Sequence, residues 1–377
     1  MKPTVEIVDT WEGLQALAPV WNSLLAQSDV DVPFLTHEWL TAWWESFGRG
    51  RELFVLVVKG EGKIWAIAPL MRTVRRRWGI PLRTVEFLAN RHSCRTSFLL
   101  GPEKEAAIAR LVDFFQGEFP EWDEWELILL PENSDTLRLL QAELSRRGIF
   151  HGTMPDLLSP YIPIETTWKE FLASKSSHFR SELRRKRRRL EKRGRCDLQL
   201  IRETENLQAI LGRIFRLTTK TWTYELGTAL VSRPEVRQFY TRLAERAQER
   251  GWLYFALLTL EGQDLAFEYS LRYKGKVYNL KIGYDAEFRK FSPGLILKAF
   301  VLEQAFQEAR EFDLLGQASE FKQRWTPYLR HHVDLLVFNR HLVPWSRYLW
   351  QFQVKPHLRP LSRVWNRVRA LIPRPVK

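Results

Sequence analysis

The chain has 377 residues, 45% of them hydrophobic and 27% charged, a balance that favours a soluble globular protein of two domains. Its two distant cysteines, Cys94 and Cys196, exclude a disulfide framework, and no apolar run is long enough to predict a membrane span. An acid interrupts the first apolar run and argues against a signal peptide, so we expect a cytoplasmic protein.

The formal net charge of +14 is concentrated in two segments. Residues 180–195 hold ten Lys or Arg against two Glu, and residues 340–377 hold nine Lys or Arg and no acid. These two segments leave the rest of the chain slightly acidic. The pattern indicates two local anion-facing patches, and we expect no specific DNA binding.

The first half predicts alternating strands and helices. In chain order these are a strand over residues 5–8, helices over 11–27 and 36–47, a hairpin over 53–70, a helix over 105–115, a strand over 125–130 and a helix over 135–147. Thr36 is suited to cap the second helix, and Gly148 to end the last one.

The second half repeats this plan. It predicts a strand over 198–201, helices over 207–222 and 234–250, strands over 253–260, 265–272 and 277–284, a helix over 295–309, and strands over 312–315 and 333–338. The hairpins that begin at Leu53 and Leu253 carry matching turns, Glu61-Gly62 and Glu261-Gly262. The match favours two copies of one α+β unit with a boundary near residues 160–167, although hairpins in general resemble one another.

Several motifs together resemble a known family. They are YDAEFRKFSPG (284–294), FDLLG (312–316), FKQRW (321–325), FLTHEWLTAWW (34–44) and APL (68–70). The chain is similar over residues 5–340 to the CelD/BcsL-type acetyltransferases, which are named from cellulose biosynthesis, belong to the GNAT superfamily and are related to FemABX. The resemblance implies an α+β fold of tandem GNAT-like domains, with mixed central sheets flanked by helices. We expect an N-terminal domain over 1–163, a C-terminal domain with the acyl-donor site over 164–340, and a basic amphipathic tail over 341–377.

The candidate donor loop comprises Arg289, Lys290, Phe291, Ser292, Pro293 and Gly294. It resembles the GNAT pyrophosphate loop, with serine in place of the first glycine. Ser292 is a good helix N-cap, Pro293 suits the first helical position, and Gly294 allows a ligand to approach the backbone closely. Free N–H groups and the positive end of the helix dipole bind phosphate, so acetyl-CoA or another acyl-CoA is the expected donor.

Acyl transfer needs a base, an oxyanion site and an acid. Glu268 alternates with apolar residues on a strand and is the first candidate base, and Asp313 is the second. Tyr284 and Tyr328 are candidate acids, and Lys322 is a candidate partner for a phosphate or carboxylate. For these residues the alternatives are a solvated surface for Glu268 and Lys322 and core packing for the tyrosines. The scattered histidines give no metal-ligand spacing, so we expect no metal.

The basic run over 180–195 predicts a helix with one apolar stripe, either a solvated linker or a contact for a polyanion, CoA phosphates or transfer RNA. In the tail, Leu361, Val364, Trp365, Val368 and Leu371 fall on one helical face, which predicts that the tail lies on an anionic membrane surface or docks on an acidic partner. The alternative is that this face packs on the protein itself.

Three functions fit these observations. The first is acyl-CoA-dependent N- or O-acyl transfer to a sugar, polysaccharide precursor or other small acceptor. The second is aminoacyl-tRNA-dependent transfer, as the relation to FemABX implies. The third is a non-catalytic GNAT-fold scaffold, in a protein that is cytoplasmic or peripheral at the inner face of the membrane.

Overall fold

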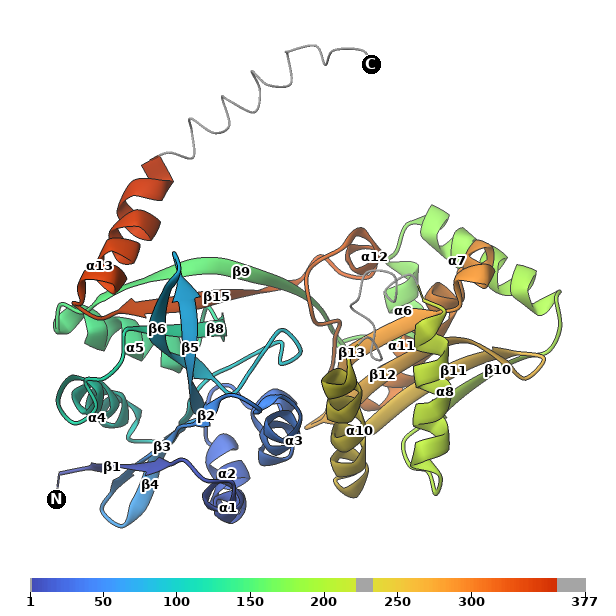
Figure 1. Ribbon diagram of the computed structural model, residues 1–377. Coiled ribbons are helices and arrows are strands. Elements are labelled where there is room, and N and C mark those ends of the chain that lie inside the picture. The colour runs from blue at the N-terminus through green and yellow to red at the C-terminus, as the bar shows by residue number, and fades with distance from the viewer. Residues whose placement is uncertain (1, 222–232, 358–377) are drawn as a thin grey trace.

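The computed structural model describes residues 2–221 and 233–357 (Figure 1). The N-terminal half contains, in order, β1 (Thr4–Val8), α1 (Trp11–Ala16), α2 (Ala18–Leu25), η1 (Pro33–Leu35), α3 (His37–Phe47), β2 (Glu52–Leu53), β3 (Val55–Gly60), β4 (Lys63–Ala68), β5 (Leu70–Arg77), β6 (Ile80–Phe87), β7 (Leu99–Leu100), α4 (Lys104–Gly117), β8 (Glu124–Pro131), α5 (Asp135–Arg146) and β9 (Phe150–Pro163).

The C-terminal half continues with α6 (Trp168–Ala173), α7 (Ser177–Glu191), β10 (Cys196–Ile201), α8 (Leu207–Thr219), α10 (Pro234–Glu249), β11 (Leu253–Leu260), β12 (Gln263–Tyr273), β13 (Lys276–Tyr284), the 3-10 helix η2 (Ala286–Phe291), α11 (Pro293–Glu308), β14 (Glu311–Asp313), α12 (Glu320–Gln323), β15 (Leu329–Phe338), α13 (Leu342–Tyr348) and the π-helix η3 (Leu349–Val354).

Helix ends follow local chemistry. The Thr36 hydroxyl accepts a hydrogen bond from the Trp39 N–H at 3.3 Å, which confirms the predicted cap of α3. The single helix expected over 11–27 is wrong, because the chain forms α1 and α2 with a break at Leu17. Pro19 lies in the first turn of α2, where its missing N–H costs nothing, but within a continuous helix it would remove a hydrogen bond.

Both predicted hairpin turns are present and have the same geometry. Glu61 and Gly62 have φ of 52° and 74°, and Glu261 and Gly262 have φ of 48° and 79°. Two successive residues with positive φ are characteristic of the type I′ turns that match strand twist. The hairpins differ after the turn, since Pro69 separates β4 from β5 whereas β12 continues to Tyr273.

One continuous sheet joins the two halves. Its eleven strands follow the order β10-β11-β12-β13-β14-β9-β15-β8-β6-β5-β2, and a separate sheet follows the order β1-β3-β4-β7. The long strand β9 links the halves, because its last residues pair with β14 and its earlier residues pair with β15 (Figure 1). The division near residue 163 stays a prediction.

The strand predicted over residues 333–338 was expected in the C-terminal domain, but it pairs with strands of the N-terminal half. β15 lies between β8 and β9, antiparallel to both, so residues 329–338 complete the part of the sheet that belongs to the N-terminal half. A strand's partners depend on contacts far along the chain, which local patterns do not encode.

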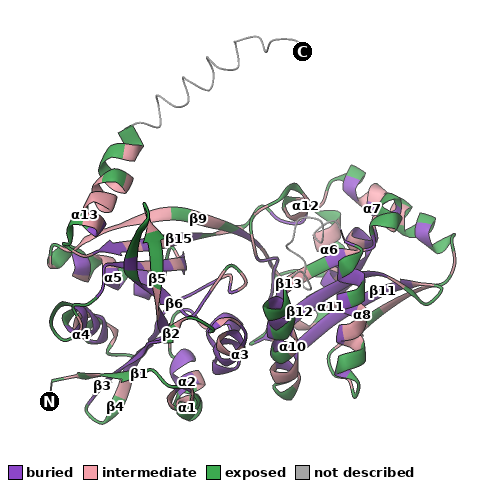
Figure 2. Cartoon of the chain, in the orientation of Figure 1, coloured by how far each residue is buried: buried purple, intermediate pink, exposed green. Residues whose placement is uncertain are grey.

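A shared core also connects the halves. α3 packs against α10, with the rings of Trp39 and Phe239 5.1 Å apart in an edge-to-face arrangement. Both side chains are fully buried, and the facing sides of the two helices are buried in Figure 2. Truncation of such a buried aromatic costs about 3–5 kcal/mol, so this contact fixes the two halves relative to each other.

Candidate active site

The central feature of the C-terminal half is a split between β13 and β14. These parallel strands pair only between residues 276–278 and 311–313. Beyond that point β13 continues to Tyr284, while the chain after Asp313 turns away through Leu315 and Gly316, which both have positive φ. A β-bulge opposite Tyr269 and Ser270 leaves Leu280 outside the register with β12. The backbone of β13 beyond Asn279 is therefore not paired with β14.

A cavity of about 150 Å³ lies at this split. β13 contributes Asn279, Leu280, Lys281 and Ile282, the segment after β14 contributes Leu314, Leu315 and Gly316, and the remaining lining residues are Arg91, His92, Cys94, Tyr240 and Lys322. Both halves of the chain thus contribute to one site. The lining includes three cationic side chains and no carboxylate, so the cavity favours a ligand that carries or develops negative charge.

Burial changes the titration of three cavity residues. Burial lowers the pKa of Lys281, and no carboxylate among the described residues pairs with its ammonium group, which lies 5.6 Å from the centre of the Tyr240 ring. Burial lowers the pKa of Lys322 to about 8. Burial, followed by the charges of Lys281 and Arg233, lowers the pKa of His92 to about 3. His92 is therefore neutral near pH 7, with Nδ1 3.2 Å from the Tyr240 hydroxyl.

Glu268 lies behind the cavity wall. Its side chain is 2% exposed and forms an ion pair of 2.8 Å with Lys298 of α11. The Asn279 amide donates to Glu268 at 3.1 Å, and its oxygen accepts from Lys298 at 2.7 Å. Burial raises the pKa of Glu268, although the Lys298 charge opposes this shift. The alternative of a solvated strand face is wrong, and Glu268 reaches the cavity only through Asn279.

Asp313 is fully buried and holds the halves together. One oxygen accepts from Arg95 of the N-terminal half and, at 3.1 Å, from Arg330, and the other accepts the Leu315 N–H at 3.0 Å. Burial alone would raise the pKa of Asp313, but Arg95 and Arg330 hold it below its ordinary value. A carboxylate engaged in this way is suited to positioning the loop after β14, and its predicted role as a base gains no support from the geometry.

The donor loop follows β13 directly. Tyr284 ends the strand, η2 carries exposed Arg289 and Lys290 together with buried Phe291, and α11 begins at Pro293 as predicted. Ser292 corrects the prediction, because it adopts the left-handed conformation with φ of 56° and its side chain caps nothing. The αL residue reverses the chain between η2 and α11, which a capping serine in the extended region does not do.

Gly294 presents the free backbone at the start of α11. Its N–H has no acceptor within residues 2–221 and 233–357, whereas the next N–H donates to the Ser292 carbonyl at 3.0 Å. A Cβ added at Gly294 would lie 3.4 Å from Cδ1 of Tyr284. The glycine therefore lies against Tyr284, about 7 Å along β13 from Ile282 of the cavity lining at a rise of ~3.3 Å per residue.

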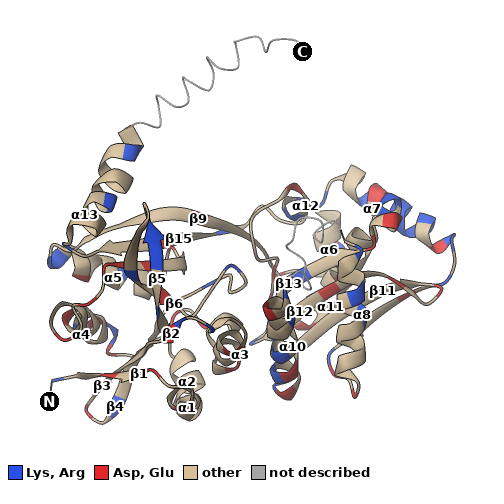
Figure 3. Cartoon of the chain, in the orientation of Figure 1, with Lys and Arg blue, Asp and Glu red and all other residues tan. Residues whose placement is uncertain are grey.

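The basic run forms α7, which lies against the donor loop. The Lys186 ammonium donates to the Lys290 carbonyl at 2.9 Å, and the guanidinium groups of Arg189 and Arg193 lie 5.5 and 5.6 Å from the Phe291 ring. Phe179, Leu183 and Leu190 form the buried stripe of the helix, as predicted. Two basic segments that lie about one hundred residues apart in the sequence are thus brought together, and Figure 3 shows the basic residues along α7.

The other predicted residues are distributed unevenly. Lys322 lines the cavity and donates to the carbonyls of Leu315 and Gln317. Tyr328 lies outside the cavity lining, 52% exposed, with its ring 5.8 Å from that of Tyr161. Sequence reasoning missed His92, Cys94, Tyr240, Asn279 and Lys281. The only sequence signal was the pair of polar residues Asn279 and Lys281 inside an otherwise apolar strand.

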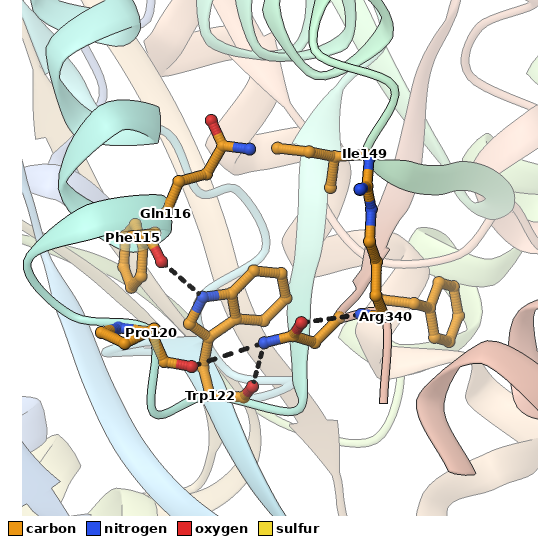
Figure 4. A pocket seen from close by; sticks show the side chains of 8 residues that line it. Phe115, Gln116, Pro120, Trp122, Ile149 and Arg340 are labelled. Carbon is orange, nitrogen blue, oxygen red and sulfur yellow. Dashed lines mark hydrogen bonds between the residues drawn. The ribbon is translucent and has the colours of Figure 1, made fainter. Parts of the chain in front are cut away.

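A second cavity, of about 170 Å³, lies in the N-terminal half near the end of β15 (Figure 4). Its polar groups satisfy one another, because the Trp122 indole donates to the Phe115 carbonyl at 2.9 Å and the Asn339 amide donates to the Trp122 carbonyl at 2.7 Å. It has no acid–base group suited to catalysis. Among the described residues, no group of three His, Cys, Asp or Glu is placed to hold a metal, and no helix is long and apolar enough to cross a membrane.

Comparisons with known proteins identify the class of this domain. Residues 177–323 match the family model of the acetyltransferase (GNAT) domain. A search of curated proteins gave no significant match.

The fold is similar to that of three solved structures. The structure of FemX has a TM-score of 0.58 at 14% identity, covering 89% of this chain and 97% of that one. The C-terminal domain of a lysylphosphatidylglycerol synthetase from Agrobacterium fabrum has a TM-score of 0.52 at 9% identity, covering 88% and 94%. L-PGS from Bacillus licheniformis has a TM-score of 0.51 at 13% identity, covering 90% and 96%. The predicted α+β fold is confirmed as a GNAT-like fold with mixed sheets flanked by helices, and residues 177–323 are similar to the acetyltransferase (GNAT) domain family.

Proposed function

We propose that the protein transfers an acyl group from acyl-CoA to an amine or hydroxyl of a small-molecule or saccharide acceptor. The observation that carries the proposal is the split between β13 and β14, which opens a cationic cavity on the same strand that leads to the donor loop. In this arrangement the diphosphate binds at Gly294 and the adjacent basic side chains, and the thioester lies in the cavity.

The chemistry needs one bond exchange. The acceptor nitrogen or oxygen attacks the thioester carbonyl, an amide or ester forms, and the C–S bond breaks to release the thiol. Backbone N–H groups of β13 beyond Asn279 that face away from β12, together with the cation of Lys281, stabilise the oxyanion of the tetrahedral intermediate. The acceptor's proton passes to a bound water, and a proton returns to the leaving sulfur, for which Tyr284 and Tyr328, the latter outside the cavity lining, remain the proposed acids.

A second candidate donor is an aminoacyl-tRNA, and a specific observation favours it. α7 extends the cationic surface of the donor loop by several exposed arginines, more than the phosphates of one CoA require. A polyanion with a long backbone is the kind of ligand that neutralises such a surface. The CelD/BcsL-type assignment, a polysaccharide acceptor and a cytoplasmic location are part of the first proposal and depend on the sequence resemblance.

The two donors are distinguished by one pair of measurements. Calorimetric titration with acetyl-CoA at low and moderate salt is compared with binding of charged and uncharged transfer RNA. Saturable acetyl-CoA binding followed by release of free thiol with an amine acceptor supports the first proposal. Preferential binding of charged transfer RNA with no acetyl-CoA binding supports the second, and the absence of both leaves the non-catalytic scaffold.

A further inference from the structure

Exposed large apolar side chains are concentrated on one part of the molecule. Seven of the twelve in the described residues lie on two elements, the tip of the β5–β6 hairpin and the helical segment after β15. They are Val74, Trp78 and Ile80 on the hairpin, and Leu342, Trp345, Trp350 and Val354 on α13 and η3. Trp78 is 62% exposed and Leu342 77% exposed, so neither is covered by the protein's own body. Such a concentration marks an interaction surface.

The two elements lie side by side. Arg77, near the hairpin tip, and Arg347 of α13 both form ion pairs with Glu124 of β8. Figure 1 shows the hairpin and α13 projecting from the same edge of the N-terminal half, and Figure 2 shows the hairpin tip exposed. The opposite side of the helical segment is anchored, because the rings of Tyr348 and Phe352 pack against Phe338.

Basic residues outnumber acids on the two elements, and some of them are paired, Arg75 with Glu86 and Arg77 with Glu124 and Glu126. Residues 70–80 contain four arginines and no acid, and residues 340–357 contain two arginines, one lysine and no acid. Figure 3 shows basic residues on both elements. Residues 358–377 continue the chain from η3 and add six more Lys or Arg, again without an acid.

We propose that the hairpin tip and the segment 342–354 form a docking face for an anionic lipid bilayer. The face presents tryptophans and aliphatic side chains flanked by arginines, which is the composition of an interfacial membrane-binding surface. Tryptophan and arginine together prefer the boundary between headgroups and acyl chains. A nucleic acid binds the arginines but offers no apolar phase for Val74, Ile80 and Leu342, so the observations favour lipid.

The test is co-sedimentation of the full chain with vesicles of phosphatidylcholine alone or with phosphatidylglycerol. We expect binding to the anionic vesicles, weakened by salt, and little binding to the neutral ones. The double variant Trp78→Ser/Trp350→Ser removes two exposed side chains and should reduce the partition coefficient at least about tenfold. Val20→Ser, which changes a side chain of comparable exposure outside this face, is the matched control and should bind like the wild type.

Three outcomes would overturn the proposal. If the double variant binds vesicles as well as the wild type and has the same circular dichroism, the exposed tryptophans do not contribute. Binding would then come from charge or from residues 358–377 alone. Absence of binding to anionic vesicles at low salt would exclude a bilayer. Competition by a short RNA duplex that removes all vesicle binding, together with equal RNA affinity of the double variant, would identify a nucleic-acid face instead.

Discussion

Lys281 illustrates how one residue in the cavity balances stability against function. Burial lowers the pKa of the Lys281 ammonium group in the folded protein. In the unfolded chain the same group has the ordinary lysine pKa of about 10.4, so it binds its proton more tightly there. At neutral pH this difference destabilises the fold, and the penalty decreases as the pH rises towards that value. A residue retained at such a cost is a candidate for function.

We therefore expect Lys281→Met to raise the thermal midpoint at pH 7 and to lower the transfer rate. Loss of one oxyanion-stabilising group typically reduces kcat by about 10²–10³. Differential scanning fluorimetry and a thiol-release assay measure the two effects, with the exposed Lys63→Met as control. A fall in stability with unchanged transfer would show that Lys281 is a structural residue.

His332 provides a pH-dependent contribution at the junction of the halves. Its Nε2 accepts from Arg95 at 3.1 Å, and its Nδ1 lies 3.3 Å from the Leu157 carbonyl, so the ring is neutral and donates through Nδ1. Burial, followed by the Arg95 charge, lowers its pKa to about 4. As the pH falls from about 6.5 towards 4, the unfolded chain binds a proton that the folded protein does not, and stability is lost.

The expected consequence concerns His332→Gln, which keeps a donor and an acceptor but does not titrate. Between pH 7 and pH 5 the free energy of unfolding of the wild type should fall by about 2 kcal/mol more than that of the variant. Urea unfolding at both pH values measures this difference. An equal change in the free energy of unfolding for the two proteins between these pH values would mean that His332 has an ordinary pKa in the folded protein.

At the scale of elements, the start of α11 is the proposed binding site for the acyl donor. Gly294→Glu introduces bulk and negative charge next to Tyr284, where the diphosphate is proposed to bind, while a first-turn Glu itself favours a helix. We expect acetyl-CoA affinity to fall at least about tenfold, or ~1.4 kcal/mol, in a folded protein. Calorimetric titration measures it.

The matched control is Gly294→Ala, whose Cβ makes a contact of 3.4 Å with Tyr284 and should change affinity little. If both variants bind acetyl-CoA like the wild type, the donor lies elsewhere. If the wild type itself does not bind, the aminoacyl-tRNA and scaffold proposals gain support.

The packing of α11 against β12 depends on the buried network of Glu268, Asn279 and Lys298. Lys298→Met leaves a carboxylate without its cation and should destabilise the protein by about 3–5 kcal/mol. Glu268→Leu combined with Lys298→Met removes both charges, so the double variant should be more stable than Lys298→Met alone. Chemical denaturation of the set tests this, and additive losses would contradict the coupling.

At the scale of the whole molecule, β15 makes the halves interdependent. Because it lies between β8 and β9, a chain that ends at residue 328 lacks the strand that these two share. We expect this truncation to unfold or aggregate, whereas a chain that ends at residue 357 should retain the wild-type midpoint. Thermal unfolding curves of the two chains, followed by circular dichroism, measure the difference. A folded 1–328 chain would show that the N-terminal sheet is stable without β15.

The sequence by itself determined the features that depend on neighbouring residues. The hairpin turns at Glu61-Gly62 and Glu261-Gly262, the start of α11 at Pro293, the Thr36 cap and the apolar stripe of α7 follow from local backbone and side-chain preferences. These preferences, together with the motifs, were sufficient to predict the GNAT-like fold and to select the donor loop as the candidate site.

Only the tertiary structure decided which distant segments meet. The cavity joins His92 and Cys94 to Lys281, Asp313 binds Arg95 across more than two hundred residues, and β15 returns to the N-terminal sheet. Ser292 adopts a left-handed conformation because the connection between η2 and α11 requires it. Strand pairing and burial of charge are selected by the free energy of the whole packed chain, so no local pattern specified these contacts.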